Sequence, residues 1–368
     1  METLKRIRLY RQHLTDKADK RTVVRDLNGL QAQFTVNSFH ALKIRCNEEL
    51  SEAAYGENLV KNWTVRGTVH VFAKDDLPLF CHGKERYRSM EFSGYGFFGE
   101  KGYALAKSWG YPEDFLRECQ EKGCAWTLSP ERQADWSAFI VRRVAEGVSD
   151  REELKKLCTE NGMTKFELDS MFDSWGGGMR ELCERGFLNY KVQEKKAFAL
   201  CPEFEPMETE AAELEIFRRY LLHYAPATIR DMAYYYGCSQ TKVKAMLAKL
   251  PAEKITRNGA DYFYMGDLNG DYPDIPPCLL LAGFDPLMLG YKKEESVFLP
   301  REHLRGIFNL AGIVMPAVLL DGRVVGKWSR KNGKVTFALF ETVSERGRRA
   351  ITEAAEACWK DIRSISWN

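Results

Sequence analysis

The clearest periodic pattern of apolar and polar positions lies between Ala227 and Met265. Residues 227–236 have the pattern of a helix that stops at Gly237, and Ser239 can cap a second helix over 241–250. In that second helix apolar residues recur at helical spacing, at Val243, Met246, Leu247 and Leu250. Residues 254–265 then predict two short strands around Asn258-Gly259, a preferred hairpin turn. Two helices followed by a hairpin indicate a winged helix.

The same order of elements occurs upstream. Ser149 can cap a helix over 151–161, and two more helices are predicted over 164–174 and 179–185. Residues 187–200 predict two strands that flank a charged turn. The pattern therefore predicts a second winged helix.

The beginning of the chain predicts a third copy. Apolar periodicity favours helices over 23–30 and 38–49, and residues 63–72 have the composition of a single strand. After a Pro- and Asp-rich linker over 270–277 the pattern changes, and it predicts short apolar strands and a final amphipathic helix, over 279–282, 317–320, 323–329, 335–340 and 350–362.

We therefore expect an α+β fold of three tandem winged-helix modules and a small C-terminal β-rich domain. The expected boundaries are 1–100, 101–205 and 206–270 for the three modules and 271–368 for the C-terminal domain. The length of 368 residues agrees with several domains.

Composition adds few constraints. Lys and Arg number 54 against 52 Asp and Glu, so a surface that binds nucleic acid has to come from local clustering rather than from net charge. The ten cysteines show no Cys-x-x-Cys spacing, so we expect no zinc site and no cofactor. The charged N-terminus does not have the pattern of a signal peptide, and no run of residues has the pattern of a membrane span. We expect a cytoplasmic protein, associated with the nucleoid when bound to DNA, with no membrane partner.

Two glutamines are candidates for chemistry. Gln31 and Gln33 flank Ala32, and in an extended segment residues two apart point to the same side. Two amides together offer donors and acceptors that can orient a water molecule without carrying charge. The alternative from spacing alone is a pair of solvated surface amides.

Four blocks of the sequence resemble the AlkZ-like DNA glycosylase family. These are VRDLNGLQAQ over 24–33, WTVRGTVH over 63–70, FDPLMLGY over 284–291 and VLLDGRVVGKW over 318–328, which stand in the family's order. The resemblance implies tandem winged helices with a C-terminal β domain, excision of alkylated purines from duplex DNA, and in some members the unhooking of interstrand crosslinks. It also implies that Gln31 and Gln33 are catalytic, because the family's motif is two glutamines around an apolar residue.

The resemblance also gives the chemistry. A guanine alkylated at N7 is cationic and leaves readily, so two neutral amides that position a water can suffice. No clear nucleophilic lysine occurs at the motif, so we expect a monofunctional hydrolase that acts as a monomer. The alternative is a non-catalytic winged-helix DNA-binding protein or transcription regulator.

Two further groups of residues are candidates for DNA contact. Arg66, Thr68 and His70 alternate along the predicted strand and so would share one face, although they could equally be satisfied polar groups. The second group is a basic hairpin tip over 329–334 that could grip a groove or backbone, or be an ordinary solvated turn. Its cationic residues are Arg330, Lys331 and Lys334.

Overall fold

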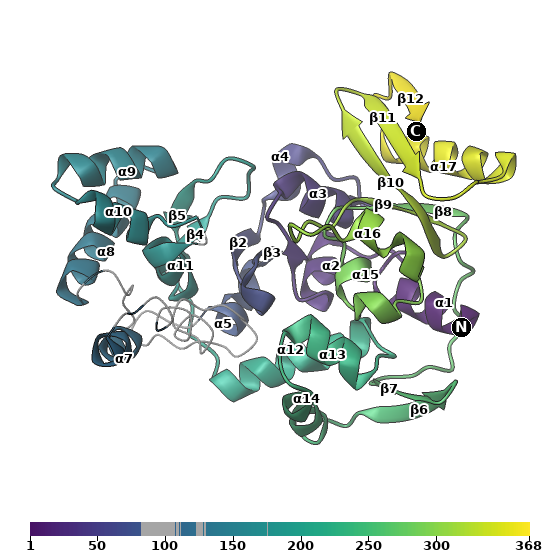
Figure 1. Ribbon diagram of the computed structural model, residues 1–368, viewed down its shortest axis with the longest axis horizontal. Helices are drawn as coiled ribbons and strands as arrows, with labels where there is room; N and C mark the ends of the chain where they lie inside the picture. Colours follow the sequence, from purple (N-terminus) through teal and green to yellow (C-terminus); the bar gives the residue numbers. More distant parts are fainter. Residues whose placement is uncertain (82–106, 108–109, 111, 123–127, 129, 175) are drawn as a thin grey trace. The chain divides into compact units, whose positions relative to one another are not determined.

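The computed structural model describes residues 1–81, 107, 110, 112–122, 128, 130–174 and 176–368 (Figure 1). These residues divide into two compact units. Unit 1 comprises Met1–Ala54, Phe217–Tyr235 and Ser239–Asn368, and unit 2 comprises Tyr55–Ile216 and Tyr236–Cys238. Both ends of the chain therefore belong to unit 1. The expected boundaries of the three winged-helix modules and the C-terminal domain stay predictions.

Unit 1 contains helices at the start of the chain, in the middle and at the end. Its helices are α1 (Glu2–Arg11), α2 (Lys20–Asp26), α3 (Thr35–Lys43), α14 (Gln240–Leu247), α15 (Pro286–Leu289), α16 (Leu304–Ile307) and α17 (Glu345–Cys358), with 3-10 turns η4 (Lys293–Glu295) and η5 (Arg301–His303). Three helices belong partly to each unit, α4 (Glu52–Tyr55), α12 (Thr209–His223) and α13 (Ile229–Tyr236).

The helix-turn-helix and hairpin predicted over 227–265 are confirmed as local elements. Gly237 follows α13 with a φ of +67°, a left-handed conformation that ends the helix, and the Ser239 hydroxyl accepts a hydrogen bond from the Lys242 amide at the start of α14. Strands β6 (Glu253–Arg257) and β7 (Ala260–Tyr264) pair antiparallel. Asn258 and Gly259 between them both have positive φ, +48° and +75°, as a type I′ turn requires.

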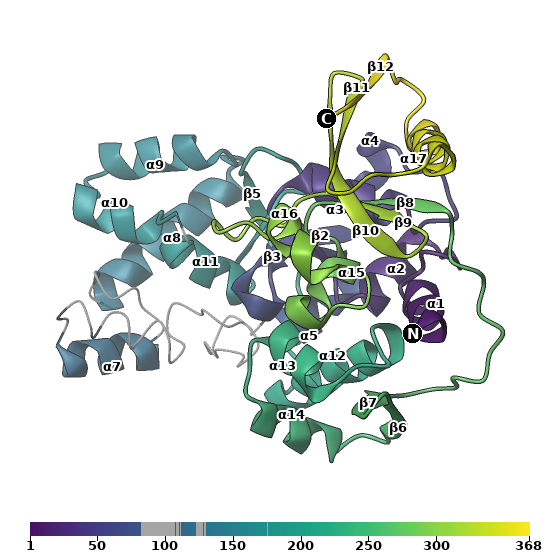
Figure 2. The same ribbon diagram turned by 45° about the vertical axis from the view of Figure 1, so that its right-hand side comes forward.

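The C-terminal part of unit 1 is one sheet with a helix along it (Figures 1 and 2). Its strands lie in the order β12 (Ser364–Trp367), β11 (Lys334–Leu339), β10 (Arg323–Lys331), β9 (Ala317–Leu320) and β8 (Cys278–Leu281). The pairs are antiparallel except for β11 with β12, which is parallel. The apolar face of α17 packs on β8 and β9.

Two details of this part differ from the sequence prediction. The terminal helix begins at Glu345, capped by the Ser344 hydroxyl, and ends at Cys358 rather than extending over 350–362. Strand β12 was not predicted, because Ser364–Trp367 is a short segment whose hydrogen-bonding partner, β11, is distant in sequence.

A buried ion pair joins Arg45, which follows α3, to Asp285, which precedes α15. The Arg45 guanidinium donates to both oxygens of Asp285 at 2.7 and 3.0 Å, and neither side chain is exposed. Asp285 also caps α15 by accepting from the Leu287 amide. Removing one partner would leave an uncompensated buried charge, so this pair links the segment after α3 to the start of α15 within unit 1.

Unit 2 combines short strands with helices. Its helices are α5 (Leu77–Phe80), α7 (Glu113–Lys122), α8 (Pro130–Ala145), α9 (Arg151–Glu160), α10 (Lys165–Met171) and α11 (Gly177–Glu184), with 3-10 turns η1 (Val65–Gly67) and η2 (Lys74–Asp76). Strands β3 (Val69–Ala73), β2 (Leu59–Trp63), β4 (Leu188–Tyr190) and β5 (Phe198–Leu200) lie side by side in that order, each antiparallel to its neighbour.

Unit 2 has one helix cap that was not predicted and one that corrects a prediction. Thr164 begins α10 with a full capping box that Glu167 completes. The cap of α9 is Asp150 and not Ser149, because the Asp150 carboxylate accepts from the amides of Glu152 and Glu153. Both residues stand before the helix, and sequence position alone does not separate them.

Helices and strands are mixed in both units. Within the described residues, the helices are all too short or too polar to cross a bilayer.

Candidate functional site

The two glutamines lie on an extended segment of unit 1 between α2 and α3. Asn28 and Gly29 end α2 in left-handed conformations, with φ of +55° and +82°, and the Gly29 amide donates to the Val24 carbonyl at 2.7 Å. Strand β1 (Leu30–Gln31) follows at once. The turn therefore separates the helix from the motif and leaves the motif extended.

Gln31 and Gln33 differ in burial. The side chain of Gln31 is 7% exposed, Ala32 is fully buried and Gln33 is exposed. Phe34, 38% exposed, stacks on Phe284 with ring centroids 6.1 Å apart just before α3 begins. The motif thus combines a buried amide with an amide at the surface.

Residues from α12 and its end hold the chain just before the motif. The Arg219 guanidinium donates to the Arg25 carbonyl at 3.1 Å, and the Tyr224 hydroxyl donates to the Leu27 carbonyl at 2.9 Å. Both acceptors are backbone groups at the end of α2. These bonds satisfy helix-end carbonyls and fix the direction in which the chain leaves α2.

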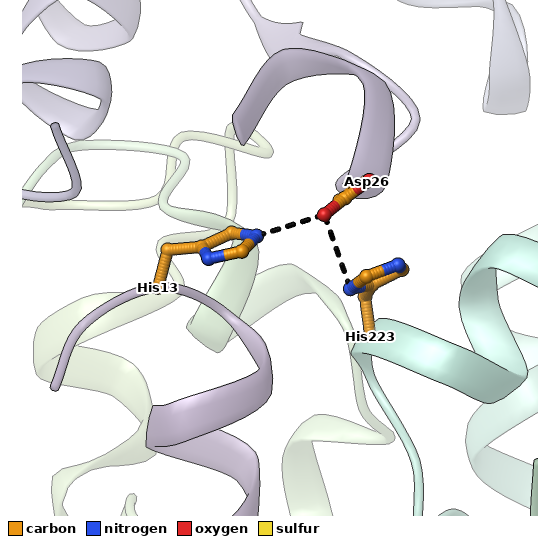
Figure 3. Close-up of side chains that lie close together, drawn as sticks. All are labelled: His13, Asp26 and His223. Atoms are coloured by element: carbon orange, nitrogen blue, oxygen red, sulfur yellow. Dashed lines mark hydrogen bonds and ion pairs between the residues drawn. The ribbon is translucent and has the colours of Figure 1, made fainter. Parts of the chain in front are cut away.

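A cluster of His13, Asp26 and His223 lies at the same end of α2 (Figure 3). His13 follows α1, Asp26 is the last residue of α2 and His223 is the last residue of α12. The Oδ2 atom of Asp26 lies 3.0 Å from His13 Nε2 and 3.5 Å from His223 Nδ1. The cluster was not predicted from the sequence, because its members are far apart in the chain and show no ligand spacing.

Burial shapes the protonation of this cluster. It lowers the pKa of His223 to about 4, although the nearby Asp26 carboxylate opposes the shift. Burial alone would raise the pKa of Asp26, but the hydrogen bond with His13 and the charge of Arg25 outweigh it and lower the pKa. Asp26 is therefore a carboxylate at neutral pH, and the His223 ring is neutral.

Arg66, Thr68 and His70 do not lie along one strand, and this corrects the prediction of a single strand over 63–72. Strand β2 ends at Trp63 and β3 begins at Val69, and they pair as a hairpin. Arg66 and Gly67 between them both have a φ of +61°. Two left-handed residues in succession reverse the chain, so the alternation of faces is lost.

The three side chains nevertheless gather at this turn in unit 2. His70 Nδ1 lies 3.0 Å from the Thr68 carbonyl, and its Nε2 accepts from the Arg66 guanidinium at 3.3 Å. The Thr68 hydroxyl donates to the Val65 carbonyl. Burial, aided by the Arg66 charge, lowers the pKa of His70 to about 3, so its ring is neutral.

The basic hairpin has the predicted form in unit 1. Lys331 pairs with Lys334 across Asn332 and Gly333, whose φ values are +50° and +75°. Lys331 and Lys334 are exposed. Arg330 forms an ion pair with Asp361 and lies over the Trp359 ring at 5.6 Å, so its charge is partly neutralised.

Comparisons with known proteins agree with these observations. The family model DNA glycosylase AlkZ-like matches residues 24–360. The chain belongs to this family.

Two similar proteins come from Streptomyces sahachiroi. An interstrand DNA cross-link repair glycosylase is 25% identical over 377 residues, which cover 95% of this chain and 92% of that protein. The solved structure of DNA glycosylase AlkZ superposes with a TM-score of 0.74 at 20% identity and covers 100% of this chain and 98% of that chain. The mixed helix and sheet fold is therefore shared along the whole chain.

Proposed function

We propose that this protein hydrolyses the N-glycosidic bond of N7-alkylated purines in duplex DNA, with Gln31 and Gln33 positioning the attacking water. The observation that carries this proposal is the family match over residues 24–360, which includes the Gln-Ala-Gln motif. The fixed backbone before the motif supports it, because a water can be oriented only by groups that are themselves held in place.

The chemistry suits two neutral amides. A purine alkylated at N7 carries a positive charge, so it leaves without protonation by a strong acid. As the bond breaks, the sugar develops positive charge, and amide oxygens can stabilise that charge while they align the water. The buried Gln31 would fix one side of this arrangement and the exposed Gln33 would face the DNA.

DNA contact is proposed at two places, each within one unit. In unit 2 the turn with Arg66, Thr68 and His70 offers a guanidinium for a phosphate. In unit 1 Lys331 and Lys334, with a lesser contribution from Arg330, give the hairpin an exposed positive tip. We propose that the helix and hairpin groups are three tandem winged helices that bind DNA, and that the protein acts as a monomer.

The product follows from the same chemistry. No lysine stands between Gly29 and Phe34, so the proposed enzyme transfers the sugar to water and leaves an abasic site with an unbroken strand. The name of the Streptomyces relative extends the substrate class to interstrand crosslinks.

The proposal is tested with duplex DNA that carries one 7-methylguanine. The full chain should release the free base and leave an abasic site that breaks only after alkaline treatment. Direct strand breakage by the protein would refute the monofunctional mechanism. Tight binding without base release would refute the enzyme and favour a DNA-binding regulator.

A further inference from the structure

The cluster of His13, Asp26 and His223 brings two imidazole nitrogens and one carboxylate oxygen within 4.8 Å of one another. Asp16 offers His13 Nδ1 a backbone carbonyl at 3.3 Å, and a carbonyl can only accept. His13 Nε2 lies 3.0 Å from Asp26 Oδ2, which is a hydrogen bond when Nε2 carries a proton. A metal ion bound between the two atoms would take the place of that proton.

The distances suit a metal ion. Zinc binds imidazole nitrogen and carboxylate oxygen at about 2.0–2.2 Å in tetrahedral geometry, which separates neighbouring ligand atoms by roughly 3.3–3.6 Å. The two separations from Asp26 Oδ2 are 3.0 and 3.5 Å, and all three ligand atoms lie within 4.8 Å of one another (Figure 3). Small adjustments of the side chains would therefore place one ion in contact with all three.

The groups around the cluster are those that orient metal ligands. The second nitrogen of His13 faces the Asp16 carbonyl, and the Oδ1 atom of Asp26 accepts from the Arg25 guanidinium at 3.0 Å. Such outer contacts fix the ring and the carboxylate of a metal site. His13 and His223 are 13% and 22% exposed, so water can reach a fourth position.

We propose that His13, Asp26 and His223 form a binding site for one divalent transition-metal ion, with zinc as the best match and water as the fourth ligand. Two imidazoles and one carboxylate are a borderline donor set that favours zinc over magnesium or calcium. The Arg25 guanidinium offsets part of the Asp26 charge. The site therefore binds a metal ion more weakly than it would without Arg25.

The site would join three separate parts of unit 1. It links the end of α1, the end of α2 and the end of α12, and Asp26 stands five positions before Gln31. The ion would therefore hold in place the turn that precedes the Gln-Ala-Gln motif. Metal binding itself does not depend on the proposed enzyme activity.

The test uses the full chain freed of metal with a chelator. Calorimetric titration with zinc chloride should show one ion per chain, and cobalt(II) should give the visible absorption of a tetrahedral nitrogen and oxygen site. The double variant H13Q/H223Q keeps polar side chains at both positions and should bind at least tenfold more weakly. Its melting temperature in chelator should match that of the wild type, which shows that it folds.

A variant of a residue outside the cluster serves as the matched control. His303 is a buried histidine of unit 1 that bonds to the Val324 carbonyl, and H303Q should bind zinc like the wild type. Zinc should also raise the melting temperature of the wild type but not of H13Q/H223Q. Equal zinc affinity in the wild type and H13Q/H223Q, no binding by the wild type, or a cobalt spectrum dominated by thiolate bands would each overturn the proposal.

Discussion

Two short segments, Asn28–Phe34 and Thr64–His70, were selected by the same argument, that residues two apart share a face of an extended chain. Each contains two successive residues with positive φ, Asn28-Gly29 in the first and Arg66-Gly67 in the second. In the first segment this turn precedes the candidate residues, and the motif stays extended. In the second it lies among them and replaces the strand by a hairpin. Residues two apart therefore share a face only where no turn interrupts the extended segment.

The two segments also differ in what holds them. The Arg66 turn is stabilised by its own neighbours, since Thr68 and His70 bond within five residues. The turn before Gln31 is held by Arg219 and Tyr224, almost 200 positions away. The contacts that hold the second segment are thus local in sequence, whereas those that hold the first come from a distant part of the chain.

The largest expected effect is on the pH dependence of the free energy of unfolding, which His70 in the second segment should control. The folded pKa of His70 is about 3, below its ordinary value, so its neutral ring stabilises the fold fully above pH 6.5. That stability is lost as pH falls from about 6.5 toward 3, because the unfolded state binds the proton first. The slope should reach about 1.4 kcal/mol per pH unit. Urea unfolding between pH 7 and pH 4 should be less pH-dependent in H70Q, and equal slopes would disprove the assignment.

Matched glycine substitutions should come next. Gly29→Ala and Gly67→Ala each force a side chain into a left-handed conformation at a cost of about 1–2 kcal/mol. Because only Gly29 leads into the motif, we expect base release by the folded protein to fall about tenfold in G29A. G67A should keep its rate constant at saturating enzyme. Similar rate constants for the two variants would show that the turn before Gln31 does not position the motif.

Two tyrosine substitutions test the long-range contact that holds the turn before Gln31. Tyr224→Phe removes the bond to the Leu27 carbonyl, and Tyr236→Phe removes a comparable buried bond to the Ile216 carbonyl in unit 2. Each should lower the free energy of unfolding by about 1 kcal/mol. Only Y224F should also slow base release by a few-fold, and an equal slowing in Y236F would point to a general loss of stability instead.

Arg66 should give the smallest effect. If its guanidinium meets a phosphate, Arg66→Ala weakens DNA binding a few-fold and reduces the slope of log affinity against log salt by about 1. Lys74→Ala, which removes an exposed cation elsewhere in unit 2, is the control. An unchanged salt slope in R66A would mean that Arg66 serves only the turn and His70.

Sequence reasoning succeeded where local preferences decide the structure. Asn258-Gly259 and Asn332-Gly333 form the predicted turns because both residues accept positive φ at low cost. It failed at Arg66, since arginine rarely adopts that conformation and nothing in its neighbours marks the exception. It also missed β12 and the cluster of His13, Asp26 and His223, which exist only through contacts between distant parts of the chain.

The most direct test of the account is the rate constant of the chemical step for Gln31 and Gln33. Single-turnover excision of 7-methylguanine at saturating enzyme should fall by about 10²–10³-fold in Q31A and in Q33A, while affinity for the lesion duplex stays nearly unchanged. Gln193→Ala, an exposed glutamine of unit 2, should react like the wild type. Wild-type rate constants in both Q31A and Q33A would contradict the assignment of catalysis to this motif.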